Sequence, residues 1–204
     1  MRIAVLGAGR VGSALARGWA RSGHEVVLGV REGSGRDGGD LPSAPLAAAA
    51  AGAQVVVNAL PGARSLELLQ QQVGAAALEG KVLVDVANAV DEHFELLHPE
   101  VGLGALVQRT FPAARVVKTL NTVPAAVMVG PESLGAPSSV FLSGDDADAK
   151  RVTAGLLTDL GWQPETHVDL GGIETARASE HYLFLSLALM GATGSTAYNV
   201  RVVR

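Results

Sequence analysis

A glycine turn close to the amino terminus is the part of this chain whose residue types and spacing most directly suggest chemistry. The segment Gly7-Ala8-Gly9-Arg10-Val11-Gly12 follows the apolar run 2–6 and precedes residues 13–21, which carry apolar side chains at helical spacing. In such a strand–turn–helix unit the first glycine allows a sharp turn, the second lets a pyrophosphate approach the backbone, and the third lets the helix pack on the strand. The helix N-terminus adds unpaired N–H groups and a positive dipole end. The turn therefore predicts a dinucleotide site.

The glycine pattern alone is weak evidence, because 25 glycines in 204 residues produce such spacings by chance. The segment Gly33-Ser34-Gly35-Arg36-Asp37-Gly38 has the same spacing. It leads into residues 39–42, Gly-Asp-Leu-Pro, and not into an amphipathic helix, so we expect a flexible loop there. Context thus favours the first match as the dinucleotide site. The alternative for that match is a turn with only a packing role.

The end of the second predicted strand, Glu25–Val30, indicates which dinucleotide the site takes. Enzymes that select NAD usually place an acid there to accept the ribose 2′-hydroxyl, whereas an arginine accommodates the 2′-phosphate of NADP. Here the strand is followed by Arg31, and Arg36 lies in the loop beyond it. Both guanidinium groups could pair with a phosphate. The sequence favours NADP; the alternatives are that Arg31 is a solvated charge and that Glu32 serves as the acid for NAD.

Further candidates follow the later apolar runs, because a doubly wound sheet binds its ligand across the carboxyl ends of its strands. We expect residues 58–61 to contact the middle of the cofactor and the polar segment 121–125 to face its nicotinamide end. The asparagine after the run 81–86 could contact a carboxamide or ribose, or could simply form a turn. The candidate residues at these strand ends are Asn58, Leu60, Pro61, Asn88, Asn121, Thr122 and Ala125.

The order of predicted elements indicates an α/β fold with a doubly wound, mainly parallel sheet. We expect a dinucleotide-binding domain over residues 1–160 and a small helical C-terminal element over residues 161–204. Within that element Ile173–Met190 is apolar almost all round, which predicts a helix buried in its own chain or in a partner, and we expect a homodimer. Ser195 is expected to cap a final short helix. The other predictions are a loop over residues 32–45, a helix over residues 64–78 and a last strand over residues 161–168.

Composition narrows the class of protein. A chain of 204 residues with 48% hydrophobic residues can bury one complete core, and a net charge of -4 without a run of Lys or Arg argues against nucleic acid as a partner. The lack of cysteine excludes disulfides, thiolate catalysis and cysteine-ligated metal. No apolar run approaches the ~20 residues that cross a bilayer, and no signal-type segment precedes the first strand. We therefore expect a cytoplasmic protein without a membrane partner.

Several of these segments together resemble one known family, the NADP oxidoreductases that depend on the deazaflavin coenzyme F-420. The cytosolic reductase domains of the six-helix membrane metalloreductases are similar. The chain departs from the family at Val30, where serine is common, in a short 32–52 segment that leaves one strand in question, and in a C-terminus poor in aromatic residues. The resemblance is carried by the glycine turn, by Leu-Gly-Val-Arg at 28–31, Val-Ala-Asn at 86–88, Val-Lys-Thr-Leu-Asn-Thr-Val-Pro-Ala at 117–125 and Ser-Gly-Asp-Asp at 143–146.

The resemblance implies a Rossmann-type domain with a small C-terminal addition. It also implies direct hydride transfer between NADP(H) and a deazaflavin (F-420), or a flavin such as FAD or FMN, stacked on the nicotinamide. Arg31 would then hold the 2′-phosphate, and residues 121–125 would lie on the nicotinamide side. By the same resemblance, the pyrophosphate would be held by Gly7, Gly9, Arg10, Val11 and Gly12.

Two other functions stay open. An NADPH-dependent reductase of a small imine or hydroxyacid would share the first 160 residues, but such enzymes need a larger helical domain and a proton donor. His167 and His181 are the histidines near the expected wall for a second substrate, with packing or surface roles as the alternative. A non-enzymatic NADP(H)-binding redox sensor needs no catalytic group. Hydride transfer between two stacked rings needs none either, because the rings carry the chemistry.

Overall fold

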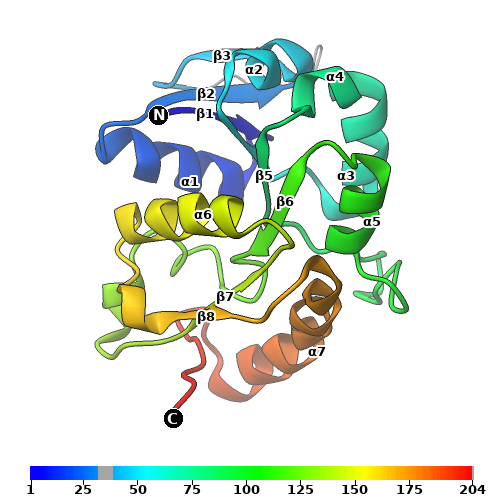
Figure 1. Ribbon diagram of the computed structural model, residues 1–204. Helices are drawn as coiled ribbons and strands as arrows, with labels where there is room; N and C mark the ends of the chain where they lie inside the picture. The colour runs from blue at the N-terminus through cyan, green and yellow to red at the C-terminus, as the bar shows by residue number, and fades with distance from the viewer. Residues whose placement is uncertain (32–38, 204) are drawn as a thin grey trace.

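One eight-stranded sheet runs through the computed structural model, which describes residues 1–31 and 39–203 (Figure 1). The strands are β1 (Arg2–Leu6), β2 (Glu25–Val30), β3 (Ser43–Pro45), β4 (Val55–Asn58), β5 (Val82–Asp85), β6 (Arg115–Thr119), β7 (Val140–Ser143) and β8 (His167–Asp169). Their spatial order is β3-β2-β1-β4-β5-β6-β7-β8, and every neighbouring pair is parallel except β6 and β7. The predicted doubly wound, mainly parallel α/β fold is confirmed.

Helices cover both faces of the sheet. The helices are α1 (Arg10–Arg21), α2 (Leu46–Gly52), α3 (Gly62–Leu68), α4 (Ala75–Leu78), α5 (Leu103–Thr110), α6 (Ala147–Asp159) and α7 (Ala176–Thr193). Because side chains alternate along a strand, Val5 packs on the face of α1 and α6 with Trp19, and Leu6 packs on the opposite face with Leu46 of α2. Burial on both faces explains why the inner strands are apolar runs and do not alternate.

The strand order reverses at β1. The chain moves from β1 outward to β2 and β3, and then returns to place β4 on the other side of β1, with Leu6 opposite Asn58. In open α/β sheets this reversal leaves a crevice at the carboxyl ends of the strands. A ligand site is therefore expected at the edge of the sheet where β1 and β4 end.

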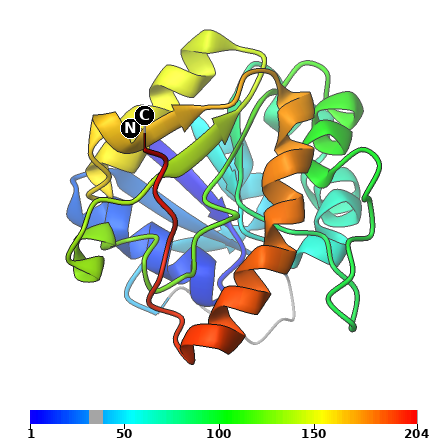
Figure 2. The same ribbon diagram turned by 90° about the horizontal axis from the view of Figure 1, so that it is seen from below.

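The C-terminal segment begins inside the sheet. Strand β8 pairs with β7, so the first part of the expected element 161–204 extends the sheet. After β8 the chain forms α7, and the last segment returns beside the start of β7, where the amide of Ser139 donates to the carbonyl of Val200 at 2.8 Å (Figure 2).

Some predicted elements differ in the structure. The loop expected over residues 32–45 contains the short edge strand β3. The helix expected over residues 64–78 is divided into α3, a π-helical turn over Leu69–Val73, and α4, because Gly74 has φ 81° and cannot continue a helix.

The C-terminal predictions also need correction. The last strand is shorter than residues 161–168, because Pro164 opens a 3₁₀ turn over Pro164–Thr166 and leaves only β8 in the sheet. Helix α7 continues to Thr193. Ser195 caps no further helix: its hydroxyl accepts a hydrogen bond from the amide of Ala197 at 2.9 Å in an extended segment.

Candidate active site

A cleft of about 340 Å³ opens at the carboxyl ends of β1, β2 and β4. It lies where the strand order reverses, the place at which folds of this type bind their ligands. The cleft is lined by Gly7, Ala8, Gly9, Arg10, Val11, Gly29, Val30, Arg31, Ala59, Leu60 and Pro61. Seven of the residues singled out in the sequence thus share one cavity: Gly7, Gly9, Arg10, Val11, Arg31, Leu60 and Pro61.

The glycine turn has no room for a side chain at its first and last positions, Gly7 and Gly12. Gly7 has φ 109°, and a Cβ atom there would lie 2.5 Å from the carbonyl oxygen of Ala59. A Cβ atom on Gly12 would lie 1.9 Å from the carbonyl oxygen of Gly7. Gly12 is buried beneath the cleft floor and lets α1 approach β1 closely.

The first turn of α1 presents donors to the cleft. The helix begins after Gly9, whose carbonyl accepts a hydrogen bond from the amide of Ser13 at 2.9 Å. Gly9 has no side chain to cap the helix, and the first turn contains no acid. The leading N–H groups have no acceptor within the helix. The geometry suits an anion such as a pyrophosphate.

Arg31 lies on the rim of this cleft, at the end of β2. It is exposed, and among residues 1–31 and 39–203 no ion pair holds its guanidinium group. Arg36, the other arginine expected at the 2′-phosphate, and Glu32, the possible acid for NAD, lie outside the described residues.

Asn58 does not line the cleft. It is fully buried at the end of β4, and its side-chain amide donates to Oδ1 of Asp85 at 2.8 Å. Its own Oδ1 accepts a hydrogen bond from the amide of Leu60 at 3.4 Å. The structure therefore places Asn58 beneath the cleft, where it supports the turn that carries Leu60 and Pro61.

Asn88 and Asn121 form a reciprocal pair between the ends of β5 and β6. Asn88 Nδ2 donates to the backbone carbonyl of Asn121 at 2.9 Å, and Asn121 Nδ2 donates to Oδ1 of Asn88 at 3.1 Å. The hydroxyl of Ser179, on α7, donates to Oδ1 of Asn121 at 3.2 Å. We call Asn88, Asn121 and Ser179 the amide cluster. Ser179 was not among the sequence candidates.

The segment after β6 contains a strained residue and an unpaired hydroxyl. Leu120 has φ 60°, a left-handed conformation that costs a side-chain-bearing residue about 1–3 kcal/mol. This turn places Asn121 against Asn88. Thr122 is buried, and its Oγ1 has no hydrogen-bond partner among the described residues, while Ala125 is half-buried.

Three buried charges lie close in sequence to the members of the amide cluster. Lys118 Nζ lies 2.8 Å from Oδ2 of Asp85 and 3.0 Å from Oε1 of Glu180, and the lysine and aspartate side chains are 0% exposed. Lys118 also donates to the carbonyl of Ala87. We call Asp85, Lys118 and Glu180 the ionic network; it joins β5, β6 and α7.

Burial and mutual attraction shift the ionisation of this network in opposite ways. Burial lowers the pKa of Lys118, but the carboxylates of Asp85 and Glu180 outweigh it and hold that pKa above its usual value. Burial raises the pKa of Asp85, and Glu180 adds to the shift, against the opposing effect of Lys118. The lysine therefore stays charged, while Asp85 accepts a proton more readily than an exposed aspartate.

The ionic network was missed from the sequence, although a signal was present. Lys118 and Asp85 interrupt apolar strand runs, and Glu180 interrupts an apolar helix. A charge on a strand buried on both faces must be paired, because desolvation is otherwise too costly. Which charges pair depends on the sheet order and on where α7 returns.

A doubly wound sheet with a glycine turn, an uncapped helix N-terminus and a basic rim defines a dinucleotide-binding domain. Comparison with known proteins identifies the family to which this domain belongs. Residues 2–89 match the family model described as NADP oxidoreductase, coenzyme F-420-dependent. A candidate F-420-dependent NADP-reductase from Arthrobacter sp. FB24 is 43% identical over 100% of both chains, with a TM-score of 0.94. The chain belongs to this family of NADP-dependent oxidoreductases, and the family resemblance seen in the sequence is confirmed.

Other solved structures share the fold. A hypothetical protein, SMa0349, from Sinorhizobium meliloti is 30% identical over 85% of this chain and 86% of that one, with a TM-score of 0.66. An imine reductase from Myxococcus stipitatus in complex with NADP+ is 20% identical over 95% of this chain and 63% of that one, with a TM-score of 0.70. At that identity the likeness concerns the fold alone. No helix among the described residues is long and apolar enough to cross a membrane.

Proposed function

We propose that this protein transfers hydride directly between NADP(H) and the deazaflavin coenzyme F-420, which stacks on the nicotinamide ring. The observation that carries the proposal is the cleft itself: a glycine turn at a helix N-terminus with an arginine on its rim, in a chain of the F-420-dependent family. The donors fit a phosphorylated dinucleotide, because N–H groups and a guanidinium face the cavity and the helix's first turn carries no acid.

Each part of the cleft has a role in this proposal. The first turn of α1 holds the pyrophosphate, and Arg31 pairs with the 2′-phosphate. Leu60 and Pro61 contact the middle of the cofactor from the end of β4. The amide cluster and Thr122 lie toward the nicotinamide end, where their amide and hydroxyl groups orient the ring.

The chain needs no side-chain acid or base for the transfer step. NADP(H) would supply the hydride, and the protein supplies distance and orientation. The two rings must lie ~3–3.5 Å apart in a site that excludes water. Paired side chains such as Asn88 and Asn121 are suited to this task, because each holds the other in one orientation.

Isotope transfer tests the proposal. The protein is mixed with F-420 and NADPH carrying deuterium at C4 on one face, and the reduced deazaflavin is analysed by mass spectrometry. The experiment is run with NADPH labelled on each face in turn, and direct transfer predicts deuterium on the deazaflavin with only one of the two labelled forms. Loss of the label to solvent would contradict direct transfer.

A panel of acceptors separates the proposal from its alternatives. Turnover with F-420 but not with free FMN, ferric chelate or a cyclic imine supports it. Turnover with the imine alone would favour a reductase of a small imine or hydroxyacid. The imine reductase from Myxococcus stipitatus has the same fold as this chain. NADPH binding without turnover on any acceptor would favour the redox sensor.

A further inference from the structure

Two groups of polar side chains, an outer layer and a more deeply buried inner layer, lie around the ends of β5 and β6 and on the first turns of α7. The outer layer is the amide cluster, and the inner layer is the ionic network. Each outer residue lies close in sequence to an inner one. The pairs are Asp85 with Asn88, Lys118 with Asn121, and Glu180 with Ser179.

We propose that Lys118 is a positioning residue, which acts with Asp85 and Glu180 to set the orientation of the amide cluster at the hydride-transfer end. The proposal rests on the proposed function, in which that cluster faces the nicotinamide. Lys118 reaches both sides of the pair: its ammonium binds the carbonyl of Ala87, which directly precedes Asn88, and its own backbone leads through strained Leu120 to Asn121.

Packing alone does not account for a charged network at this place. Charged groups lose their hydration when they are buried, and apolar side chains of similar volume often fill such a site without loss of stability. The network instead supplies directional bonds between three elements. Asp85 accepts from Asn58 at 2.8 Å and from the amide of Ala87 at 3.2 Å, in addition to Lys118 at 2.8 Å.

Glu180 extends this control to α7. Its carboxylate accepts hydrogen bonds from the amides of Leu103 at 2.7 Å and Gly104 at 3.0 Å, at the N-terminus of α5. The negative charge also suits the positive end of that helix. The hydrogen bonds of Glu180 to α5 therefore hold the turn of α7 that carries Ser179, one residue earlier.

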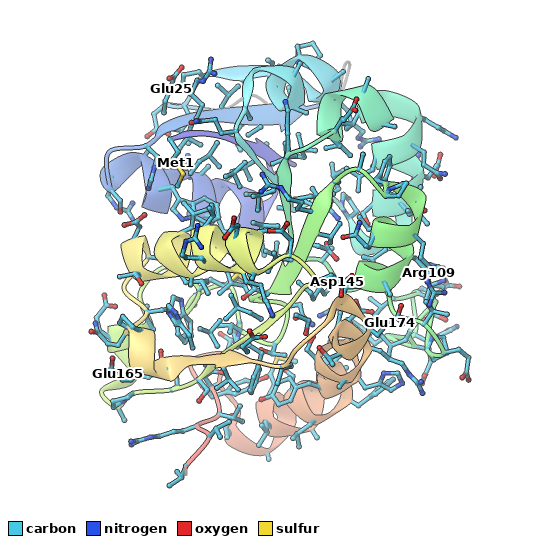
Figure 3. All side chains as sticks on the ribbon, viewed as in Figure 1. Met1, Glu25, Arg109, Asp145, Glu165 and Glu174 are labelled. Atoms are coloured by element: carbon cyan, nitrogen blue, oxygen red, sulfur yellow. The ribbon has the colours of Figure 1, made fainter. Side chains whose placement is uncertain are left out.

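A surface ion pair joins α5 to the turn just before α7 more weakly. Arg109 on α5 points toward Glu174, just before α7, with Nη2 3.0 Å from Oε1 (Figure 3). Both side chains are more than half exposed, so solvent screens their attraction. The buried contact of Glu180, and not this pair, is the one suited to fixing the orientation of α7.

The test compares Lys118→Met with Lys81→Met. Lys81 lies at the opposite end of β5 and also donates to backbone carbonyls, those of Ala50 and Ala51, at 2.5 and 2.8 Å. The side-chain amide NMR signals of Asn88 and Asn121, assigned through Asn→Asp variants, report on the cluster directly. The Kd for NADPH and kcat with F-420 are measured on the same samples.

We expect Lys118→Met to shift or broaden both amide signals and to lower kcat by roughly 100-fold, the effect of misplacing a reacting group by about 1 Å. The Kd for NADPH changes much less than kcat, because the proposed phosphate contacts, at the glycine turn and Arg31, include no residue of the ionic network. Lys81→Met leaves the signals and kcat as in the wild type. If Lys118 had only a structural role, Lys118→Met would change kcat and the Kd for NADPH together.

Unchanged amide signals in folded Lys118→Met would overturn the proposal, as would equal changes in both lysine variants. If Lys118→Met does not fold, Glu180→Gln replaces it, since glutamine keeps the size and one acceptor oxygen but removes the charge. The same signals must then shift. If the wild type reduces no acceptor, the proposed function fails, and the NMR comparison still decides the positioning role.

Discussion

At the scale of single residues, the choice between NADP and NAD depends on the tip of β2. Arg31 follows Val30 on the rim of the cleft and has no ion pair among the described residues, so its guanidinium is available to a phosphate. A planar guanidinium can make two parallel hydrogen bonds to a phosphate, which lysine cannot.

Arg31→Ala is expected to raise the Kd for NADPH by roughly tenfold or more, which corresponds to loss of one charge-assisted pair. The Kd for NADH stays nearly unchanged, because NADH lacks the 2′-phosphate. Fluorescence titration of both dinucleotides measures the difference. Arg21→Ala, at the far end of α1 from the cleft, is the control and leaves both constants unchanged. Equal losses for NADPH and NADH would refute the assignment to NADP.

At the scale of elements, the edge strand β8 is attached to the sheet by β7 and to α6 by one ion pair. Lys150 Nζ on α6 lies 2.8 Å from Oδ2 of Asp169. Partial burial raises the pKa of Asp169, but the hydrogen bond from Lys150 and that from the amide of Gly171 outweigh it and lower the pKa below its usual 3.8. The folded state therefore favours the ionised carboxylate.

Asp169→Asn is expected to lower the free energy of unfolding at neutral pH by up to about 1 kcal/mol, since the aspartate is largely exposed. A carboxyl whose pKa is lower in the folded state stabilises the fold above its unfolded pKa, and this stabilisation is lost as the pH falls through the folded pKa. The difference between variant and wild type should therefore shrink below pH 3.8.

Urea unfolding of both proteins over a pH series measures this effect. Glu67→Gln, which removes a solvent-exposed pair with Arg64 on α3, is the control and should change little at any pH. A difference for Asp169→Asn that persists or grows under acid would contradict the role given to this pair.

At the scale of the whole molecule, the outer side of α7 remains apolar and exposed. Buried positions on α7 occur only in its first turns, at Ala176, Ser179 and Glu180. Farther along, Phe184 is 41% and Leu185 53% exposed. Exposed apolar surface of this kind marks contact sites between proteins.

We expect the protein to be a homodimer in solution through this part of α7. Leu185→Glu should convert it to a monomer, because the substitution places a charge in a contact that excludes water. Light scattering at micromolar concentration measures the mass. Leu97→Glu, at an exposed leucine outside α7, is the control and should remain dimeric. A monomeric wild type would exclude this interface.

The local elements and their order could be predicted from the sequence for a physical reason. Apolar runs such as 2–6 and 25–30 form strands because both faces of a parallel sheet are buried, and Gly7 identifies the turn because only glycine fits there. The strand β3 was not predicted, because its three residues form a strand only by pairing with β2. The π-helical turn was not predicted either; it closes locally, where the amide of Gly74 donates to the carbonyl of Leu69 at 2.9 Å.

The sequence by itself determined the strand–turn–helix unit, the basic strand end and the family, since each depends on residues that are neighbours along the chain. Only the tertiary structure decided that Asn58 supports the cleft from below and that Asn88 pairs with Asn121. It also decided that Lys118 binds both Asp85 and Glu180. These contacts join residues up to 62 positions apart, between Lys118 and Glu180. Buried polar groups must find partners wherever the fold places them, so their pairing follows from the strand order and not from sequence spacing.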